Sequence, residues 1–348
     1  MLRKSALVIL GTVVCLGLIA AEVVAGRKLH EMRQQIRDVA GAIADNRARF
    51  DYGLNKLTDI NQRLDRLEGH FSPLFSEPAP QEYSLPPLPF EKLDPLVYKT
   101  PAPCFDSFDA RTLVLFVAGQ SNAANYAGSM KRSNFGGRIL NYVRGNCFVA
   151  ADPLLGSDGD GGSMWVRMAN LLVASGTYDR VMIAPLAWGG SSIVEWQNGG
   201  HLNGFLDTTL ADLATRHIPV SAFVWVQGEA DRMAPSPYYN DQAGYARALG
   251  EVFATVRRHT PAAIYLALAS SCPNQVGSRY HSEAVRAAQQ AAASDKDRIF
   301  IGMDLDSVRD WSERYQTCHL TAEGVDNAVS QLLKAMAART PVAEAPKQ

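Results

Sequence analysis

Three short segments hold side chains of the kinds that carry out acyl transfer. Gly119-Gln120-Ser121-Asn122 places a serine hydroxyl on a small, polar turn, Gln227-Gly228-Glu229-Ala230-Asp231 holds an amide and two carboxylates, and His319 supplies an imidazole. A serine and a histidine brought together form a nucleophile and its general base. Taken singly, each has a plainer explanation: Ser121 as a helix cap, Glu229 as a loop anchor, and His319 as a surface or capping residue. Acyl transfer therefore requires a fold that brings the segments together.

The pattern around these segments predicts such a fold. Near-continuous apolar runs alternate with amphipathic stretches, which is typical of a parallel sheet covered on both faces, a three-layer α/β/α sandwich. In open sheets of this kind ligands bind beyond the carboxyl ends of the strands. Ser121 follows the first expected strand, Glu229 the third, and His319 comes after the fifth and precedes a helix that Thr321 is expected to cap. The expected strands are 112–118, 180–187, 221–227, 263–269 and 298–303, and the expected helices are 164–174, 204–216, 238–259, 281–293 and 321–338.

Together the motifs resemble the SGNH hydrolase superfamily and, within it, the sialate O-acetylesterases and acetylxylan esterase-like carbohydrate esterases. The resemblance covers roughly residues 111–338 and rests on Gly-Gln-Ser-Asn at 119–122, Gly-Gly-Ser-Ser-Ile-Val-Glu-Trp at 189–196, Gln-Gly-Glu-Ala-Asp at 227–231 and His-Leu-Thr at 319–321. It implies an SGNH/flavodoxin-like fold, with Ser121 as the nucleophile and His319 as the base. It also implies an oxyanion hole made by the backbone N–H of Ser121, the backbone N–H of Gly190 and the side chain of Gln227.

One position departs from the superfamily pattern. Most members carry Asp three residues before the catalytic His, and that residue is Gln316 here. A neutral amide cannot stabilise the imidazolium as a carboxylate does. The acetylxylan esterase-like relatives suggest Glu229 as the third member of the triad. The alternatives are Asp304, Asp306 and a backbone carbonyl that orients His319 in a dyad.

The expected activity is removal of O-acetyl groups from a polysaccharide or sialic acid through an acyl-enzyme, with no cofactor. The same residues also suit an O-acetyltransferase in extracytoplasmic polysaccharide modification, and the neutral residue at 316 suits a catalytically inactive glycan-binding scaffold. Trp188, Trp196 and Tyr126 lie near the motifs in sequence, where they either stack on a sugar or pack in the core. The five cysteines show no zinc spacing, so no structural metal site is expected.

Composition excludes other classes of protein. Among 348 residues, 34 Lys and Arg face 35 Asp and Glu, and 47% of the residues are hydrophobic. This balance excludes general disorder and gives no polybasic reason to expect nucleic acid.

The first 28 residues carry a targeting pattern. Arg3 and Lys4 precede an apolar run over 6–21, which Glu22 interrupts before 23–26 extends it. The run lies between a secretory signal and a bilayer-spanning helix in length, and 23–25 offers a cleavage site. We expect residues 1–28 to remain as a membrane anchor with the catalytic domain outside the cytoplasm, periplasmic if the source is bacterial; cleavage would make the protein secreted.

Two further segments separate this anchor from the catalytic domain. Over 29–71 apolar residues recur at spacings of three and four, which predicts a coiled-coil stalk and a homo-oligomer; a single amphipathic helix is the alternative. Nine of the 18 prolines fall in 72–110, which predicts an extended linker. The esterase domain is expected over 111–340, followed by a disordered tail, 341–348.

Export would permit disulfides among the four cysteines outside the apolar segment. Cys272 and Cys318 both belong to the predicted active-site edge, so we expect them to pair, which leaves Cys104 with Cys147. Free buried thiols are the alternative.

Overall fold

The computed structural model describes residues 99–232, 239, 241–272, 281–310, 312–315 and 318–339. The predicted anchor, the stalk, the linker up to residue 98, the tail and Gln316 lie outside the described residues. Among the described residues, no helix is long and apolar enough to cross a membrane.

An eight-stranded sheet runs through the described part of the chain. Its strands are β1 (Pro101–Ala102), β2 (Thr112–Gly119), β3 (Ile139–Val143), β4 (Asn146–Val149), β5 (Arg180–Ala187), β6 (Ala222–Val226), β7 (Ala263–Leu268) and β8 (Ile299–Asp304). Their order is β1-β4-β3-β5-β2-β6-β7-β8. The six strands from β3 to β8 in this order run parallel, but β4 is antiparallel to both β3 and β1. The sheet is therefore mixed, and the prediction of a parallel sheet is wrong at this edge.

The antiparallel edge arises from a hairpin that the sequence pattern does not predict. β3 and β4 are joined by Arg144 and Gly145, whose φ angles are +45° and +80°. Two successive residues at positive φ form the turn that suits the twist of paired strands. β1 extends this edge, and Cys104 forms a disulfide with Cys147 of β4. Residues 101–104, which fall within the segment predicted as linker, therefore belong to this edge of the sheet.

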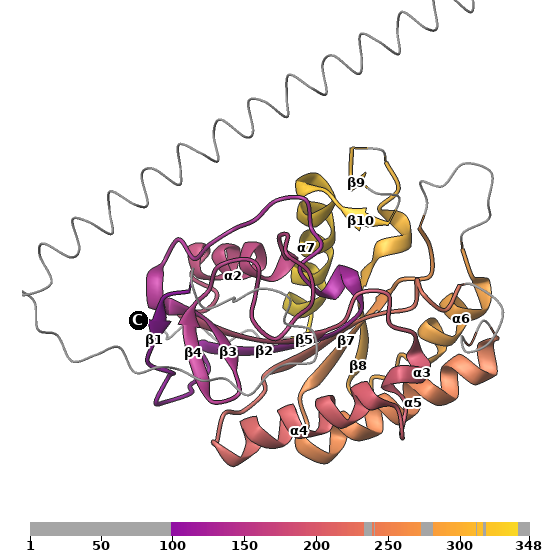
Figure 1. Cartoon of the computed structure of the whole chain (residues 1–348), viewed down its shortest axis with the longest axis horizontal. Helices are drawn as coiled ribbons and strands as arrows, with labels where there is room; N and C mark the ends of the chain where they lie inside the picture. The colour runs from indigo at the N-terminus through magenta and orange to yellow at the C-terminus, as the bar shows by residue number, and fades with distance from the viewer. Residues whose placement is uncertain are drawn as a thin grey trace, which may run out of the picture. The chain divides into compact units, whose positions relative to one another are not determined.

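Helices cover both faces of the sheet (Figure 1). One face carries α2 (Met164–Ala174) and α7 (Ala322–Ala337), and the other carries α3 (Ile193–Trp196), α4 (His201–Thr215), α5 (Gln242–His259) and α6 (Glu283–Ala291). In β2, alternate residues enter the two cores: Leu115 and Val117 on one side, Phe116 and Ala118 on the other. A strand buried on both faces needs an apolar residue at every position, which is why its sequence is a continuous apolar run.

The five predicted strands and five predicted helices are all present, with ends that differ by a few residues. Thr321 caps α7 as predicted, because its Oγ1 accepts a hydrogen bond from the Gly324 N–H at 3.3 Å. The predicted disulfide between Cys272 and Cys318 is also present.

The strand order places a switch point beside β2. After β2 the chain builds β3, β4 and β5 on one side, and it then crosses to build β6, β7 and β8 on the other. Ligands of open α/β sheets bind where the direction of winding reverses in this way. The carboxyl ends of β2 and β6 flank that point.

Candidate active site

The Gly-Gln-Ser-Asn turn begins where β2 ends. Gly119 has a φ of +136°, and a Cβ at this position would lie 1.9 Å from the carbonyl oxygen of Val226 at the end of β6. Only glycine combines this backbone conformation with so close an approach. The Gln120 N–H donates to the same oxygen at 2.9 Å. The ends of β2 and β6 are therefore held side by side.

The side chain of Gln120 orders the segment that follows β6. Its Oε1 accepts hydrogen bonds from the N–H groups of Gly228 at 3.2 Å and Ala230 at 3.0 Å. Gln120 is 3% exposed, so these bonds are made away from water. This ordering role was not predicted, because the two partners lie more than a hundred residues further along the chain.

The structure brings the Ser121 and His319 segments together. Ser121 opens the short 3₁₀ helix η3 (Ser121–Ala123) and is 6% exposed. His319 lies in β10 (His319–Leu320), which pairs antiparallel with β9 (Arg314–Tyr315). η3 packs against β10, and the Asn122 side-chain amide donates to the carbonyl of Cys318 at 3.2 Å.

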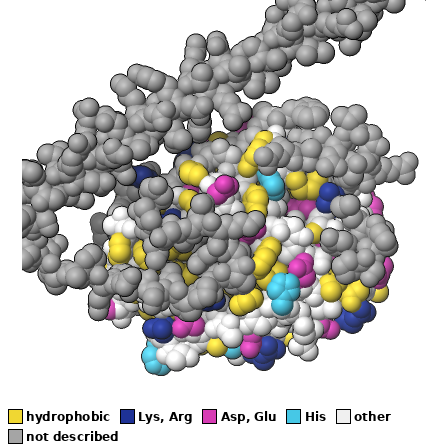
Figure 2. All heavy atoms as spheres, viewed as in Figure 1, with side chains coloured by type: hydrophobic (Ala, Val, Ile, Leu, Met, Phe, Trp, Pro, Cys, Tyr) yellow, Lys and Arg dark blue, Asp and Glu magenta, His cyan; other side chains and the backbone are white. Residues whose placement is uncertain are grey.

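His319 is half-buried between two tyrosines. The centroid of its ring lies 4.9 Å from that of Tyr126 and 5.8 Å from that of Tyr315. Burial lowers the pKa of His319, and the charge of Arg314 lowers it further. Both effects favour the neutral imidazole, which is the form that a general base requires. Figure 2 shows His side chains near Asp and Glu side chains on the face viewed there, with hydrophobic side chains around them.

Glu229 lies at the same edge but binds Asn122. Its Oε1 accepts from the Asn122 Nδ2 at 2.8 Å, and its Oε2, which is buried, has no hydrogen-bond partner. Glu229 is 1% exposed, and this burial raises the pKa of its carboxyl. Among the described residues the Glu229 carboxylate makes no hydrogen bond to His319.

The two alternative carboxylates are bound to an arginine. Asp304 accepts two hydrogen bonds from Arg286, at 2.9 and 2.6 Å. Asp306 accepts from Arg286 at 2.9 Å and from the hydroxyls of Ser270 and Ser271 at 2.7 and 2.8 Å. This network holds the ends of β7 and β8 together and occupies both carboxylates.

Gln227 is enclosed in a buried network of its own. Its Nε2 donates to Asp231 at 2.5 Å and to the carbonyl of Ser191 at 3.1 Å, while its Oε1 accepts from the Tyr245 hydroxyl at 2.9 Å. Asp231 also accepts from the Ile193 N–H at 2.9 Å, and burial raises the pKa of Asp231 to about 6. The network thus joins the segments after β5 and β6, and the role of Gln227 toward an oxyanion stays a prediction.

Gly190 lies on the turn that follows β5, which neighbours β2 in the sheet. The Trp188 N–H donates to the Gly119 carbonyl at 2.9 Å, which places this turn against the start of the Ser121 segment. Gly190 has a φ of +72° and is exposed, and its turn leads into α3. The positive φ is one that glycine adopts without strain.

Tyr126 and Asp158 form one wall of the site. The Tyr126 hydroxyl donates to Asp158 at 2.8 Å, and the same carboxylate oxygen accepts from the Gly189 N–H at 3.2 Å. Sequence spacing gave no signal for this pairing. Of the other aromatic residues, Trp196 is fully buried and therefore belongs to the core, whereas Trp188 is half-buried.

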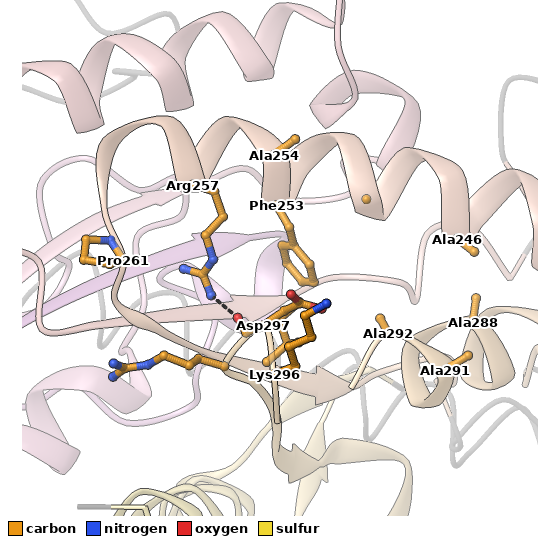
Figure 3. Close-up of a pocket in the computed structure, with 13 residues that line it drawn as sticks. Ala246, Phe253, Ala254, Arg257, Pro261, Ala288, Ala291, Ala292, Lys296 and Asp297 are labelled. Atoms are coloured by element: carbon orange, nitrogen blue, oxygen red, sulfur yellow. Dashed lines mark hydrogen bonds between the residues drawn. The ribbon is translucent and has the colours of Figure 1, made fainter. Parts of the chain in front are cut away.

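A separate hollow of about 670 Å³ lies away from this edge (Figure 3). α5 and α6 border it with small residues such as Ala246 and Ala288, and Arg257 and Asp297 lie near the beginning of β8. Ligands of open sheets bind at the opposite, carboxyl ends of the strands. The described residues contain no group of three side chains that could hold a metal ion.

The fold and this site define an SGNH-type hydrolase, and comparisons with known proteins agree. The sequence over 111–338 matches the family described as carbohydrate esterase, sialic acid-specific acetylesterase. Since the match spans more than half of the chain, the protein belongs to this family and is a carboxylic-ester hydrolase. A search of curated proteins finds no significant match.

Solved structures with a similar fold include three proteins of low sequence identity. A protein from Arabidopsis thaliana is 18% identical, with a TM-score of 0.52 over 66% of this chain and 99% of that one. The protein NanS is 16% identical, with a TM-score of 0.47 over 66% of this chain and 99% of that one. A carbohydrate acetylesterase from Xanthomonas citri is 15% identical, with a TM-score of 0.43 over 68% of this chain and 59% of that one. At these identities the likeness concerns the fold alone.

Proposed function

We propose that this protein is a serine carbohydrate esterase that removes O-acetyl groups from a polysaccharide or sialic acid. The observation that carries the proposal is the contact between the two segments, in which η3 with Ser121 packs against β10 with His319 at the sheet's switch point. Membership of a family of carbohydrate acetylesterases supports the acyl group and the substrate class.

The proposed reaction has two steps. His319 takes the proton of the Ser121 hydroxyl, which attacks the carbonyl carbon of the acetyl ester; the protonated His319 then gives that proton to the departing sugar oxygen. In the second step His319 takes a proton from water, which attacks the acyl carbonyl carbon, and returns that proton to the Ser121 oxygen as acetate leaves. The N–H groups of Ser121 and Gly190 are proposed to stabilise the oxyanion in both steps. The Gln227 amide is proposed to join them by giving up one of its hydrogen bonds, to Asp231 or to the Ser191 carbonyl.

The test is acetate release by the full chain from p-nitrophenyl acetate, acetylated xylan and O-acetylated sialic acid. Ser121→Ala should abolish release above background, because no acyl-enzyme can form. Full activity in a folded Ser121→Ala variant would contradict the proposal. Transfer of acetyl to a sugar hydroxyl in preference to water would instead identify an O-acetyltransferase, and a folded chain with no turnover would favour a scaffold.

We further propose that the domain acts outside the cytoplasm, held by residues 1–28 as a membrane anchor, 29–71 as an oligomeric coiled-coil stalk and the linker that follows. The disulfides Cys104–Cys147 and Cys272–Cys318 support this placement, since such bonds persist in oxidising compartments. Membrane fractionation of the full chain and of a chain without residues 1–28 separates an anchor from a cleaved signal.

A further inference from the structure

The residue next to the proposed nucleophile joins three segments at one point. The Asn122 side-chain amide donates to Glu229 Oε1 at 2.8 Å and to the carbonyl oxygen of Cys318 at 3.2 Å. Asn122 is 6% exposed and Glu229 is 1% exposed. Because a carboxylate and a carbonyl can only accept hydrogen bonds, these two partners fix which end of the amide faces them. Asn122 thus holds the Ser121 turn against both the Glu229 segment and the His319 segment.

The carbonyl of Cys318, directly before His319, receives a second donor. Arg314 Nη1 donates to it at 2.5 Å. Arg314 is 3% exposed, its Nε donates to the Val308 carbonyl at 2.8 Å, and its Nη2 donates to the carbonyl of Leu305. The backbone at His319 is therefore held by Asn122 and by Arg314 together.

Charge links the same residues. Burial raises the pKa of Glu229 and lowers the pKa of Arg314, and the charge of each residue opposes this effect of burial on the other. A buried charge that loses its partner is strongly unfavourable. Glu229→Ala would therefore remove both the hydrogen bond from Asn122 and the negative charge near Arg314. Glu229→Gln would remove the charge but keep an oxygen that can accept the hydrogen bond.

We propose that Glu229 is a positioning residue that acts through Asn122 on the His319 segment, and that Arg314 holds the same Cys318 carbonyl. This inference rests on the proposed function of Ser121 and His319. In this arrangement the backbone at His319 is held in place by the contacts of Asn122 and Arg314 with the Cys318 carbonyl. No carboxylate at residue 316 is needed for this, and the chain has Gln316 there.

The deciding variant is Glu229→Gln, which keeps an oxygen that can accept from Asn122. A positioning role predicts a fall in kcat of roughly tenfold, whereas a carboxylate that orients the histidine of a triad loses about 10⁴-fold when it becomes an amide. Glu323→Gln, the same change at an exposed site in the first turn of α7, is the matched control and should stay within about twofold.

A double-mutant cycle tests whether Glu229 acts through Asn122. Glu229→Ala and Asn122→Ala should each lower kcat by roughly 10²-fold, and the double variant should lose far less than the product of the two single losses, because both changes break the same Asn122–Glu229 contact. Two independent losses that multiply would overturn the inference, as would a loss near 10⁴-fold in Glu229→Gln. Melting curves of all variants distinguish a loss of folding from a displacement of the His319 segment in a folded protein.

A second readout keeps this inference distinct from the proposed function. The rate at which a fluorophosphonate labels Ser121 reports an activated serine without any choice of ester substrate. If the wild-type chain is labelled at Ser121 but releases no acetate, the acetylesterase proposal fails. The positioning role is then tested with the labelling rates of the variants, for which the same fold-changes are expected as for kcat. If the wild-type chain neither labels nor releases acetate, both proposals fail.

Discussion

At the scale of the residue, His319 is prepared to act as a base at mildly acidic pH. Burial and the Arg314 charge lower the pKa of His319 from its ordinary value of 6.5. The base must be neutral, so activity should persist as the pH falls below 6.5 and decline only when His319 becomes protonated. We therefore expect the acidic limb of kcat/KM against pH to have its midpoint below 6.5. A midpoint at or above 7 would contradict this arrangement of charges.

The types of the site residues were readable from the sequence, but their contacts were not. Ser121, Glu229 and His319 were predicted to share one sheet edge because each follows a strand of the domain, and the structure places all three there. Whether the Glu229 carboxylate meets His319 or Asn122 depends on side-chain geometry between residues 107 positions apart. No periodicity encodes a contact of that kind.

At the scale of the element, the two disulfides provide a matched comparison. They span 43 and 46 residues, so the chain-entropy model assigns each about 4 kcal/mol of stabilisation. Cys318 of the Cys272–Cys318 disulfide directly precedes His319. The Cys104–Cys147 disulfide instead links β4 to the segment that follows β1, at the far edge of the sheet. The double variant Cys272→Ser, Cys318→Ser should therefore lower kcat by roughly 10-fold to 100-fold where the chain is still folded.

The double variant Cys104→Ser, Cys147→Ser is the control for that experiment. It should lower the melting temperature by a similar amount and leave kcat unchanged, because this edge of the sheet carries none of the proposed site residues. The kcat of both double variants is measured below the melting temperature of the less stable one. Equal losses of kcat in the two double variants would contradict a local role for Cys272–Cys318.

Some of the strands are easier to predict from the sequence than others. β2 and β5 are apolar at almost every position because helices cover both their faces, and both were predicted nearly to the residue. The β3–β4 hairpin was missed because its turn is Arg144-Gly145, in which an arginine adopts the positive φ usually signalled by Asn or Gly. Its strands are also short, so the alternation along them is weak.

At the scale of the whole molecule, the proposed anchor and stalk make separable predictions. An apolar segment near the amino terminus should retain the full chain in the membrane fraction, and removal of residues 1–28 should release it. If 29–71 forms a coiled coil, the released chain should remain oligomeric, because a/d side chains are buried only between helices. Removal of residues 1–71 should then leave a monomer with the esterase activity of the full chain.

Fractionation followed by light scattering measures both properties on the same three chains. A stalk that lies on the membrane or on the catalytic domain as a single amphipathic helix would make the chain without residues 1–28 monomeric. A mature chain that begins near residue 26 and is found outside the membrane fraction would show that the segment is a cleaved signal. Both outcomes leave the Ser121 and His319 chemistry intact, because that site is built entirely from residues after 111.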